Sequence, residues 1–323
     1  MGKTRELLSD PLNAAKEIAR RLELAMLFEV SAYPKPGNVH RTRNYQDTRF
    51  EHFLASAVAC RPSFETAAGR GYLIAKHELS PESAQVGGTI RDAAVNALHS
   101  QRGGNTSLGT VTLLVPLAVA AGMTFTKKRL SLHRLRLNLK RILESTTAAD
   151  TVAFYEAVAR SKPGGLGRAP QLDLTDSSSR TQILRRKIGL LDVFRIAAGW
   201  DSICLEWTTA YSITFEFGYP YFKKQLSKTD DINGATVDTY LRILAERPDT
   251  LIARKAGARK AKWASNRAKR ALGLGGSRTI AGRKQVERLD DELRTNGNLL
   301  NPGATADLTA AVVALATLSG YRP

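Results

Sequence analysis

Three carboxylates occupy positions where the surrounding apolar pattern predicts buried hydrocarbon. Glu29, Asp47 and Asp307 each lie three or four residues from an apolar residue on the same helical stripe. An ionised carboxylate stays buried only with a cation, a strong hydrogen-bond donor or a metal ion beside it. These residues are therefore candidates for acid–base chemistry or metal binding. A buried salt bridge or a helix cap is the alternative for each, and Asp307 is the most cap-like because NPGATADL opens a helix.

Two further candidates, Asn105 and Thr106, follow a pair of glycines and precede a long apolar stretch. The free N–H groups at the positive end of a helix suit a phosphate. An ordinary helix start, capped by the Asn or the Thr side chain, is the alternative. A stiff polar loop, SAYPKPGNVHRTRNYQD at 31–47, is the other stretch rich in groups that could do chemistry.

The elements that must position these residues are helices. Apolar residues recur at spacings of three and four over 18–25, 50–57 and 190–207, and no run of alternating strands is present. We predict an all-α fold, a single large helical domain over residues 1–323, with a loop at 162–171. The one β-like window, 210–222, predicts an extended connection or the end of a helix.

Two helices of this fold have unusual compositions. Small residues recur at spacings of three and four over 250–272, which predicts one helix with a narrow stripe for close packing and a basic outer side. The uncharged stretch 108–125 reaches the lower limit for a membrane span. Its glycines, proline and threonines, and the lack of a second span, favour a buried central helix instead. We expect no contact with a membrane.

Composition indicates a globular protein. The chain has 323 residues, 43% of them hydrophobic, which suffices for a sizeable core. Cys60 and Cys204 lie far apart without neighbouring histidines, which argues against a disulfide framework or a thiolate zinc site. The N-terminus shows no signal peptide. We therefore expect a cytoplasmic protein, and a homo-oligomer is left open.

The net charge of +18 is concentrated in two stretches, 127–141 and 254–284, which hold 18 of the 48 basic residues and no acid. Such runs usually form a solvated face, but they also concentrate anions, whether nucleic acid or polyphosphate. No zinc-finger or RNP signature is present, and Trp263 is the only aromatic residue within the basic clusters. We therefore do not expect nucleic acid as the partner.

The common catalytic templates, from the P-loop to HExxH and GxSxG, are absent. Four motifs appear instead, in the order PKPGNVH with a following Asp, GGNTSLG, PDTLIARKAG at 248–257 and NPGATADL at 301–308. Together they resemble the signatures of the triphosphoribosyl-dephospho-CoA synthase family. The resemblance implies an all-helical transferase that breaks the N-glycosidic bond of ATP, releases adenine and attaches the 5-triphosphoribosyl group to a hydroxyl of dephospho-CoA.

This chemistry implies roles for the candidate residues. Cleavage at C1′ develops oxocarbenium character, which a nearby carboxylate stabilises. The implied catalytic residues are Glu29, Lys35 and Asp47, and the implied ligands of Mg²⁺, the usual partner of ATP, are Asp249 and Asp307. The implied nucleotide- and phosphate-binding residues are Pro36, Gly37, Asn38, His40, Asn105, Thr106, Arg254 and Lys255.

The resemblance also suggests a purpose for the loop at 31–47. Its prolines are expected to stiffen a turn that presents Lys35, Asn38 and His40 to the nucleotide. Gly37 is expected to let the backbone approach the ligand.

One motif departs from the family pattern. Typical members read NTHKG where residues 105–109 read NTSLG, so a donor and a positive charge are missing. The segment LLDVFRIAAGWDSICLEW, 190–207, looks like a divergent branch linked to methanopterin-type one-carbon cofactors, in which a phosphoribosyl group is also attached to an alcohol. The expected partners are therefore ATP and a small alcohol, either dephospho-CoA or a pterin-type precursor. The rival classes are a basic nucleic-acid-binding protein, with strongly salt-dependent affinity and no adenine release, and an assembly protein.

Overall fold

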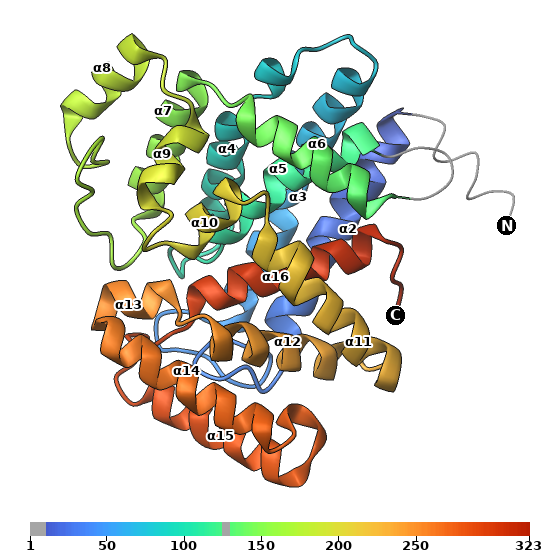
Figure 1. Ribbon diagram of the computed structural model, residues 1–323, viewed down its shortest axis with the longest axis vertical. Helices are drawn as coiled ribbons and strands as arrows, with labels where there is room; N and C mark the ends of the chain where they lie inside the picture. Colours follow the sequence, from blue (N-terminus) through green and yellow to red (C-terminus); the bar gives the residue numbers. More distant parts are fainter. Residues whose placement is uncertain (1–10, 125–129) are drawn as a thin grey trace, which may run out of the picture.

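The computed structural model describes residues 11–124 and 130–323, and these ranges contain helices and loops but no strand (Figure 1). The α-helices are α2 (Pro11–Ser31), α3 (Phe50–Ala75), α4 (Val86–His99), α5 (Leu108–Thr124), α6 (Leu132–Glu144), α7 (Ala148–Ser161), α8 (Ser177–Arg186), α9 (Leu190–Ala197), α10 (Ser202–Thr208), α11 (Tyr219–Thr229), α12 (Ile232–Glu246), α13 (Thr250–Ala256), α14 (Ala258–Gly273), α15 (Ile280–Arg294) and α16 (Gly303–Leu318). The short helical turns are η1 (Pro81–Ala84), η2 (Ile213–Gly218) and η3 (Gly276–Arg278). The all-α prediction is confirmed.

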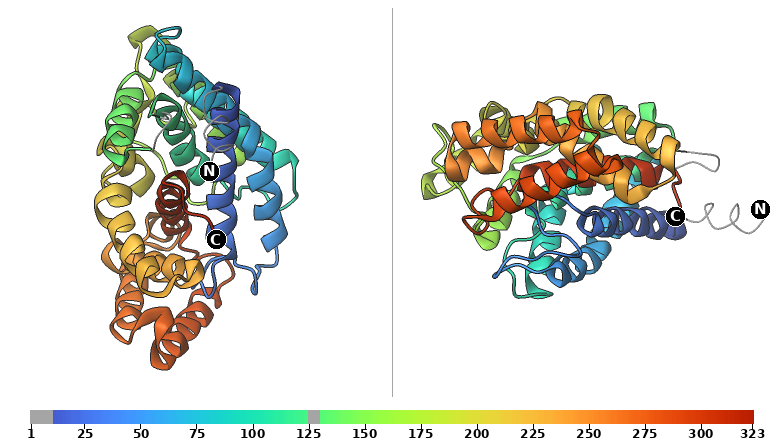
Figure 2. Two further views of the ribbon diagram at one scale, coloured as in Figure 1. Left: turned by 90° about the vertical axis from the view of Figure 1, so that its right-hand side faces the viewer. Right: turned by 90° about the horizontal axis from the view of Figure 1, so that it is seen from below.

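Helix α16 runs through the middle of the molecule (Figure 2). It packs against α2, α5 and α12. Every residue from Ala304 to Leu318 is buried except Asp307, which is partly buried. A helix that is apolar on all sides needs such a central position, because no face of it can be turned to water. Asp307 lies inside this helix, beyond its first turn, so the alternative of a helix cap does not apply.

Helix α5 is also central and is buried on nearly every side, which confirms the buried helix predicted for this stretch up to Thr124. Pro116 has no N–H, so the carbonyl of Thr112 loses its helical partner. The indole N–H of Trp207 donates to that carbonyl at 3.1 Å. Within the residues that the structure describes, no helix is long and apolar enough to cross a membrane.

Two predicted elements differ from the structure. The single helix expected over 250–272 is divided into α13 and α14, because Gly257 adopts φ 89° and ψ 156°, which no helix contains. The window 210–222 is helical from Ser212 onward, with the π-helix η2 leading into α11, so the extended alternative is wrong.

The core-facing helical position predicted for Asp47 is also wrong. Helix α3 begins at Phe50, and Asp47 is an exposed residue in the loop before it. The intervening Arg49 is extended, with φ −111° and ψ 162°. The helical spacing that led back from Phe50 to Asp47 therefore does not apply.

Helices α12 to α15 enclose a second hydrophobic cluster, to which α14 contributes its buried small residues. The other side of α14 is solvated, and its exposed basic residues are Arg259, Lys260, Lys262, Lys269 and Arg270. This is the amphipathic arrangement that the sequence predicts. In the other basic stretch, residues 127–129 lie outside the described ranges. The division into one domain over residues 1–323 stays a prediction.

Candidate active site

A cavity of about 610 Å³ lies where α7, α9 and α13 meet the starts of α5 and α16. Its apolar lining includes Phe154, Phe194 and Trp200. A smaller pocket of about 120 Å³ adjoins it. The residues that line both are Phe53, Asn105, Leu108, Gly109, Leu251, Asn301 and Asp307. The two cavities therefore share a boundary, whose polar members Asn105, Asn301 and Asp307 come from the second and fourth sequence motifs.

Asp307 lies at this boundary. The hydroxyl of Thr110 donates to its Oδ1 at 2.5 Å. A Cβ at Gly109 would lie 2.0 Å from its Oδ2, so only glycine leaves room for the carboxylate against α5. Burial raises the pKa of Asp307 to about 7, while the Thr110 hydrogen bond opposes the rise. Neighbouring carboxylates, Glu29 first among them, raise it further.

Glu29 and Lys35 form a buried pair next to Asp307. Glu29 ends the apolar stripe of α2, lines the smaller pocket, and bonds through Oε1 to the Lys35 ammonium. Lys35 Nζ also donates to the Glu29 carbonyl at 3.0 Å. Burial raises the pKa of Glu29 and lowers that of Lys35, and their mutual attraction opposes both shifts. The negative charge of Asp307 also favours the ammonium form of Lys35.

The structure corrects how the loop after α2 was expected to work. Lys35 is fully buried and faces Glu29, not the open cavity. Asn38 lines the smaller pocket and donates from Nδ2 to Asn301 Oδ1 at 3.0 Å. His40 lines neither cavity, because it is buried with Nε2 3.6 Å from Asp290 Oδ2.

Pro36 and Gly37 likewise have structural roles. Tyr240 donates its hydroxyl to the Pro36 carbonyl at 2.9 Å. Gly37 has φ +72°, and a Cβ there would lie 2.7 Å from a methyl group of Leu293. The absent side chain at position 37 therefore makes room for α15, not for a ligand. Only Asn38, of the residues that this turn was expected to present, reaches a cavity.

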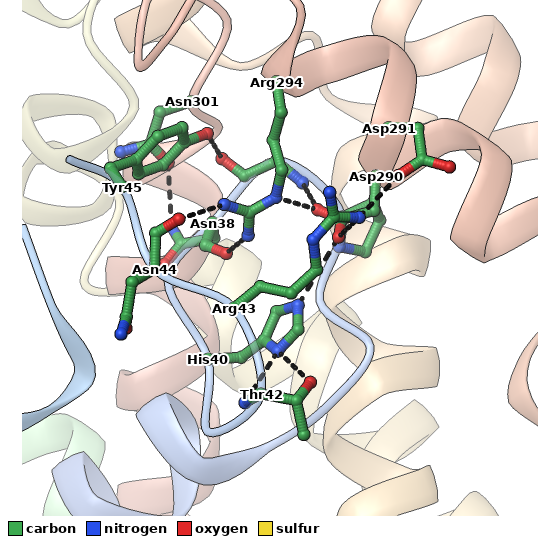
Figure 3. Close-up of polar contacts among 12 residues, drawn as sticks. Asn38, His40, Thr42, Arg43, Asn44, Tyr45, Asp290, Asp291, Arg294 and Asn301 are labelled. Carbon is green, nitrogen blue, oxygen red and sulfur yellow. Dashed lines mark hydrogen bonds and ion pairs between the residues drawn. The ribbon is translucent and has the colours of Figure 1, made fainter.

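Helix α15 holds the loop in place through residues that the sequence analysis missed (Figure 3). Asp290 accepts hydrogen bonds from Gly37 N at 2.8 Å and from Arg43 Nη1 at 2.8 Å. Arg294 donates to Asp290 at 2.6 Å and also binds the carbonyl of Asn38. No spacing in the sequence links positions 38 and 294, so no sequence signal could have paired them.

Asn105 and Thr106 lie just before α5, which begins at Leu108. Asn105 Oδ1 accepts from Leu108 N at 3.0 Å, which is a capping contact. The Thr106 hydroxyl lies 2.7 Å from that of Ser56. Both residues line the smaller pocket, and Asn105 also lines the larger one. The capping alternative is therefore confirmed for Asn105, and phosphate binding stays a prediction for a residue that lines both cavities.

Asp249 is placed differently from a metal ligand. Its Oδ1 accepts from Leu251 N at 2.8 Å and from Ile252 N at 3.0 Å, which caps α13. Its Oδ2 accepts from both the N–H and the hydroxyl of Thr305, each at 2.7 Å. Four donors occupy the four lone pairs of the carboxylate, so none is left for a metal ion. Among the described residues, no group of three or more His, Cys, Asp or Glu side chains is placed to hold a metal ion.

Two cations of α13 line the larger cavity. Arg254 is paired with Asp201, which caps α10. Lys255 donates from Nζ to the carbonyl of Asn298 at 2.7 Å and to its Oδ1 at 3.0 Å. Asn298 in turn donates from Nδ2 to Asp47 Oδ2 at 3.0 Å. Asp47 therefore lies at the cavity next to Lys255, although it is not on a helix.

The site thus draws together residues from every motif of the chain. Glu29 and Asp307 line the smaller pocket, Asp47 and Asp307 line the larger one, and Asn105 lines both. The carboxylates at this boundary can accept a proton, and the α13 cations can bind an anion.

Comparisons with known proteins point to one family. The chain is 24% identical over 96% of its length to a Pseudomonas fluorescens protein named "Probable 2-(5''-triphosphoribosyl)-3'-dephosphocoenzyme-A synthase", of which the match covers 94%. It is 26% identical over 92% of its length to the Klebsiella pneumoniae 2-(5''-triphosphoribosyl)-3'-dephosphocoenzyme-A synthase, of which the match covers 89%.

The fold is also known from a crystal structure. An Archaeoglobus fulgidus protein, described provisionally as a triphosphoribosyl-dephospho-CoA synthase, aligns with a TM-score of 0.60 and 24% identity over 83% of this chain and 100% of the other. Residues 15–323 match the family described as ATP:dephospho-CoA triphosphoribosyl transferase. Because this match covers nearly the whole chain and its motifs form the walls of the cavities, the protein belongs to the ATP:dephospho-CoA triphosphoribosyl transferase family.

Proposed function

We propose that this protein transfers the 5-triphosphoribosyl group of ATP to a hydroxyl of dephospho-CoA and releases adenine. The bond between C1′ and the adenine nitrogen breaks, and a bond forms between C1′ and the hydroxyl oxygen of the acceptor. The hydroxyl proton leaves through the enzyme, and the departing adenine takes up a proton. Membership of the family and the names of the relatives support this assignment.

Asp307 is the proposed proton acceptor, and its placement is the observation on which the mechanism rests. It lies at the boundary of two cavities with a pKa of about 7. A general base works best when its pKa is close to the operating pH, because it is then both largely ionised and sufficiently basic. An ionised Asp307 would also stabilise positive charge that develops at C1′. This role replaces the metal ligation expected from the sequence.

The buried Glu29–Lys35 pair acts as a positioning element in this proposal. Its two charges hold the end of α2 beside Asp307 and compensate each other at buried positions. Arg254 and Lys255 are the proposed phosphate ligands, since both cations line the larger cavity. Asp47 assists by holding Asn298, which orients Lys255.

The residues of the site do not form a binding site for Mg²⁺ by themselves. Asp249 has no free lone pair, and Asp307 is the proposed proton acceptor. We propose that Mg²⁺ would enter as part of the ATP substrate and would neutralise negative charge on its phosphates. Calorimetry is expected to show no binding of Mg²⁺ to the protein alone and tighter binding of ATP with Mg²⁺ than with a chelator. Binding of Mg²⁺ without nucleotide would show that the protein holds a site of its own.

The direct test is to incubate the protein with ATP, Mg²⁺ and dephospho-CoA and to follow free adenine by chromatography. We expect adenine and a dephospho-CoA product whose mass has grown by the triphosphoribosyl group. Omission of the acceptor is the control and should stop adenine release or reduce it strongly. Formation of ADP in place of adenine would identify a kinase or ligase and contradict the proposal.

A second acceptor, a pterin-type alcohol, is favoured by one feature. Leu108 lines both cavities at the position where typical members of the family carry a lysine. The site therefore has one cation fewer for the diphosphate of dephospho-CoA, and its aromatic lining suits a planar ring. The same assay with a pterin alcohol as acceptor decides between the two. Both reactions release adenine, so the acceptor that supports adenine release is the substrate.

A further inference from the structure

The segment 163–168 joins α7 to the turn before α8 and covers the two cations of α13. Its residues Pro163, Gly164, Leu166 and Gly167 line the larger cavity. Gly165 packs on α13 so closely that a Cβ there would lie 2.9 Å from Lys255 Cγ and 3.1 Å from Arg254 Cβ. None of these residues has a role in the reaction proposed above.

Hydrogen bonds of backbone N–H groups fix the residues at both ends of the segment, whereas the N–H groups in its middle form none with a described residue. The N–H of Lys162 donates to the carbonyl of Val158 at 2.9 Å, and the N–H of Ala169 donates to Asp173 Oδ2 at 2.5 Å. Between these anchors, the N–H groups of Gly164, Gly165, Gly167 and Arg168 donate no hydrogen bond to any residue in the described part of the chain. Of these four residues, Gly164 and Gly167 line the larger cavity, so free amide donors are available at its wall.

The charge beneath the segment is incompletely neutralised. Arg254 has a carboxylate partner in Asp201. The Lys255 ammonium forms no ion pair with a described residue: it donates to two neutral oxygens of Asn298, and the carboxylates of Asp47 and Asp249 act on it from farther away. Arg168, at the end of the segment, forms no ion pair with a described residue. Free backbone N–H groups near cationic side chains are a typical arrangement for binding phosphate oxygens.

We propose that residues 163–168 form a polyphosphate-binding loop, which binds a phosphate chain held by Arg254 and Lys255. Its free amide groups bind the phosphate oxygens from the side opposite the α13 cations. Gly165 is required because it combines a φ of +71° with close contact to α13. The proposal rests on the proposed function only for the identity of the polyphosphate, which is the triphosphate of ATP or the diphosphate of dephospho-CoA.

Limited trypsin digestion of the full-length protein tests the loop without measuring activity. Arg168 is exposed and offers trypsin one bond within the loop, since the bond after Lys162 precedes a proline. Inorganic triphosphate at about ten times its dissociation constant is expected to slow cleavage after Arg168 about tenfold, because only the unbound fraction remains open. Cleavage after the exposed Lys228 is the internal control and should be unchanged. Unchanged cleavage after Arg168, although calorimetry shows the protein saturated with triphosphate, would overturn the proposal, as would the absence of triphosphate binding.

A matched pair of variants locates the effect. Gly165→Ala strains the loop and should abolish the protection, whereas Gly320→Ala imposes the same kind of strain at a φ of +102° near the C-terminus and should retain it. Equal protection in both variants would contradict the role of Gly165. Protection by ATP but not by dephospho-CoA assigns the loop to the donor, and the reverse assigns it to the acceptor. Protection without adenine release would refute the transferase proposal alone, and adenine release without protection would refute the loop alone.

Discussion

Replacing Asp307 by asparagine is expected to lower the rate of adenine release by about 10²–10⁴-fold, the usual contribution of a general base. The amide has nearly the same shape and can still accept the hydrogen bond of Thr110, but it cannot take a proton. In the unmodified protein, the rate should rise with pH up to about 7, where Asp307 ionises, and should level off above it. The asparagine variant should lack that rise. Steady-state kinetics across pH 5–9 measure both.

The same substitution is expected to leave stability equal or improved. The pKa of Asp307 in the folded protein, about 7, lies above its unfolded value, so the folded state binds this proton more tightly. The stability that protonation of Asp307 contributes is therefore fully present below the unfolded pKa and is lost as the pH rises through about 7. The neutral amide of the Asp307→Asn variant carries no such penalty at pH 8. A lower melting temperature at pH 8 would show that Asp307 stabilises the fold and would argue against a catalytic carboxylate held at a cost to stability.

Gly109→Ala is a second way to disturb the same carboxylate. The added Cβ would meet Asp307 Oδ2 at 2.0 Å and must displace it. The rate of adenine release by the Gly109→Ala variant should fall, as it does in the Asp307→Asn variant. Gly69→Ala is the matched control, because that helical glycine has nothing within 4 Å of the position of the new Cβ, and its activity should be retained.

Lys35→Met is expected to destabilise the protein by about 3–5 kcal/mol, because it leaves the buried carboxylate of Glu29 without its cation. The melting temperature should fall by roughly 5–15 °C. Lys35 was expected at the ligand, where its loss would affect turnover alone, but it is fully buried.

The pH dependence and a double variant separate this cause from a general loss of packing. Without Lys35, the folded pKa of Glu29 rises further, so the deficit should be small at pH 5 and grow as the pH rises. Adding Glu29→Gln should restore most of the stability at pH 8, because no buried charge then remains. Lys269→Met, at an exposed lysine of α14, should leave the melting temperature nearly unchanged. A pH-independent deficit that Glu29→Gln does not relieve would refute the ion-pair explanation.

Much of this protein could be predicted from local patterns in its sequence. The spacing of apolar residues gives a helix wherever it persists, because the α-helical period is a property of consecutive residues. The same spacing placed Glu29 and Asp307 on buried stripes, and both carboxylates lie at the site. It failed at Asp47 and at Gly257, where an extended or left-handed residue interrupts the helix. The ordered motifs identified the family, because each is a short contiguous string.

Only the tertiary structure decided which of the polar residues meet a ligand. Asp249 stands next to a helix start, a position that suits a metal ligand and a helix cap equally well. The structure shows that its carboxylate accepts four hydrogen bonds, two of them from Thr305 of another helix. His40 stands in a motif that suggests binding, yet Asp290 of α15 lies beside it. These partners are separated by tens to hundreds of residues, and a pattern of spacing contains no information about such contacts. The sequence determined that the chain offers carboxylates and cations to a buried site, and the packing of α13, α15 and α16 determined which of them remain free, because each hydrogen bond within the protein uses an oxygen or an N–H that a ligand would need.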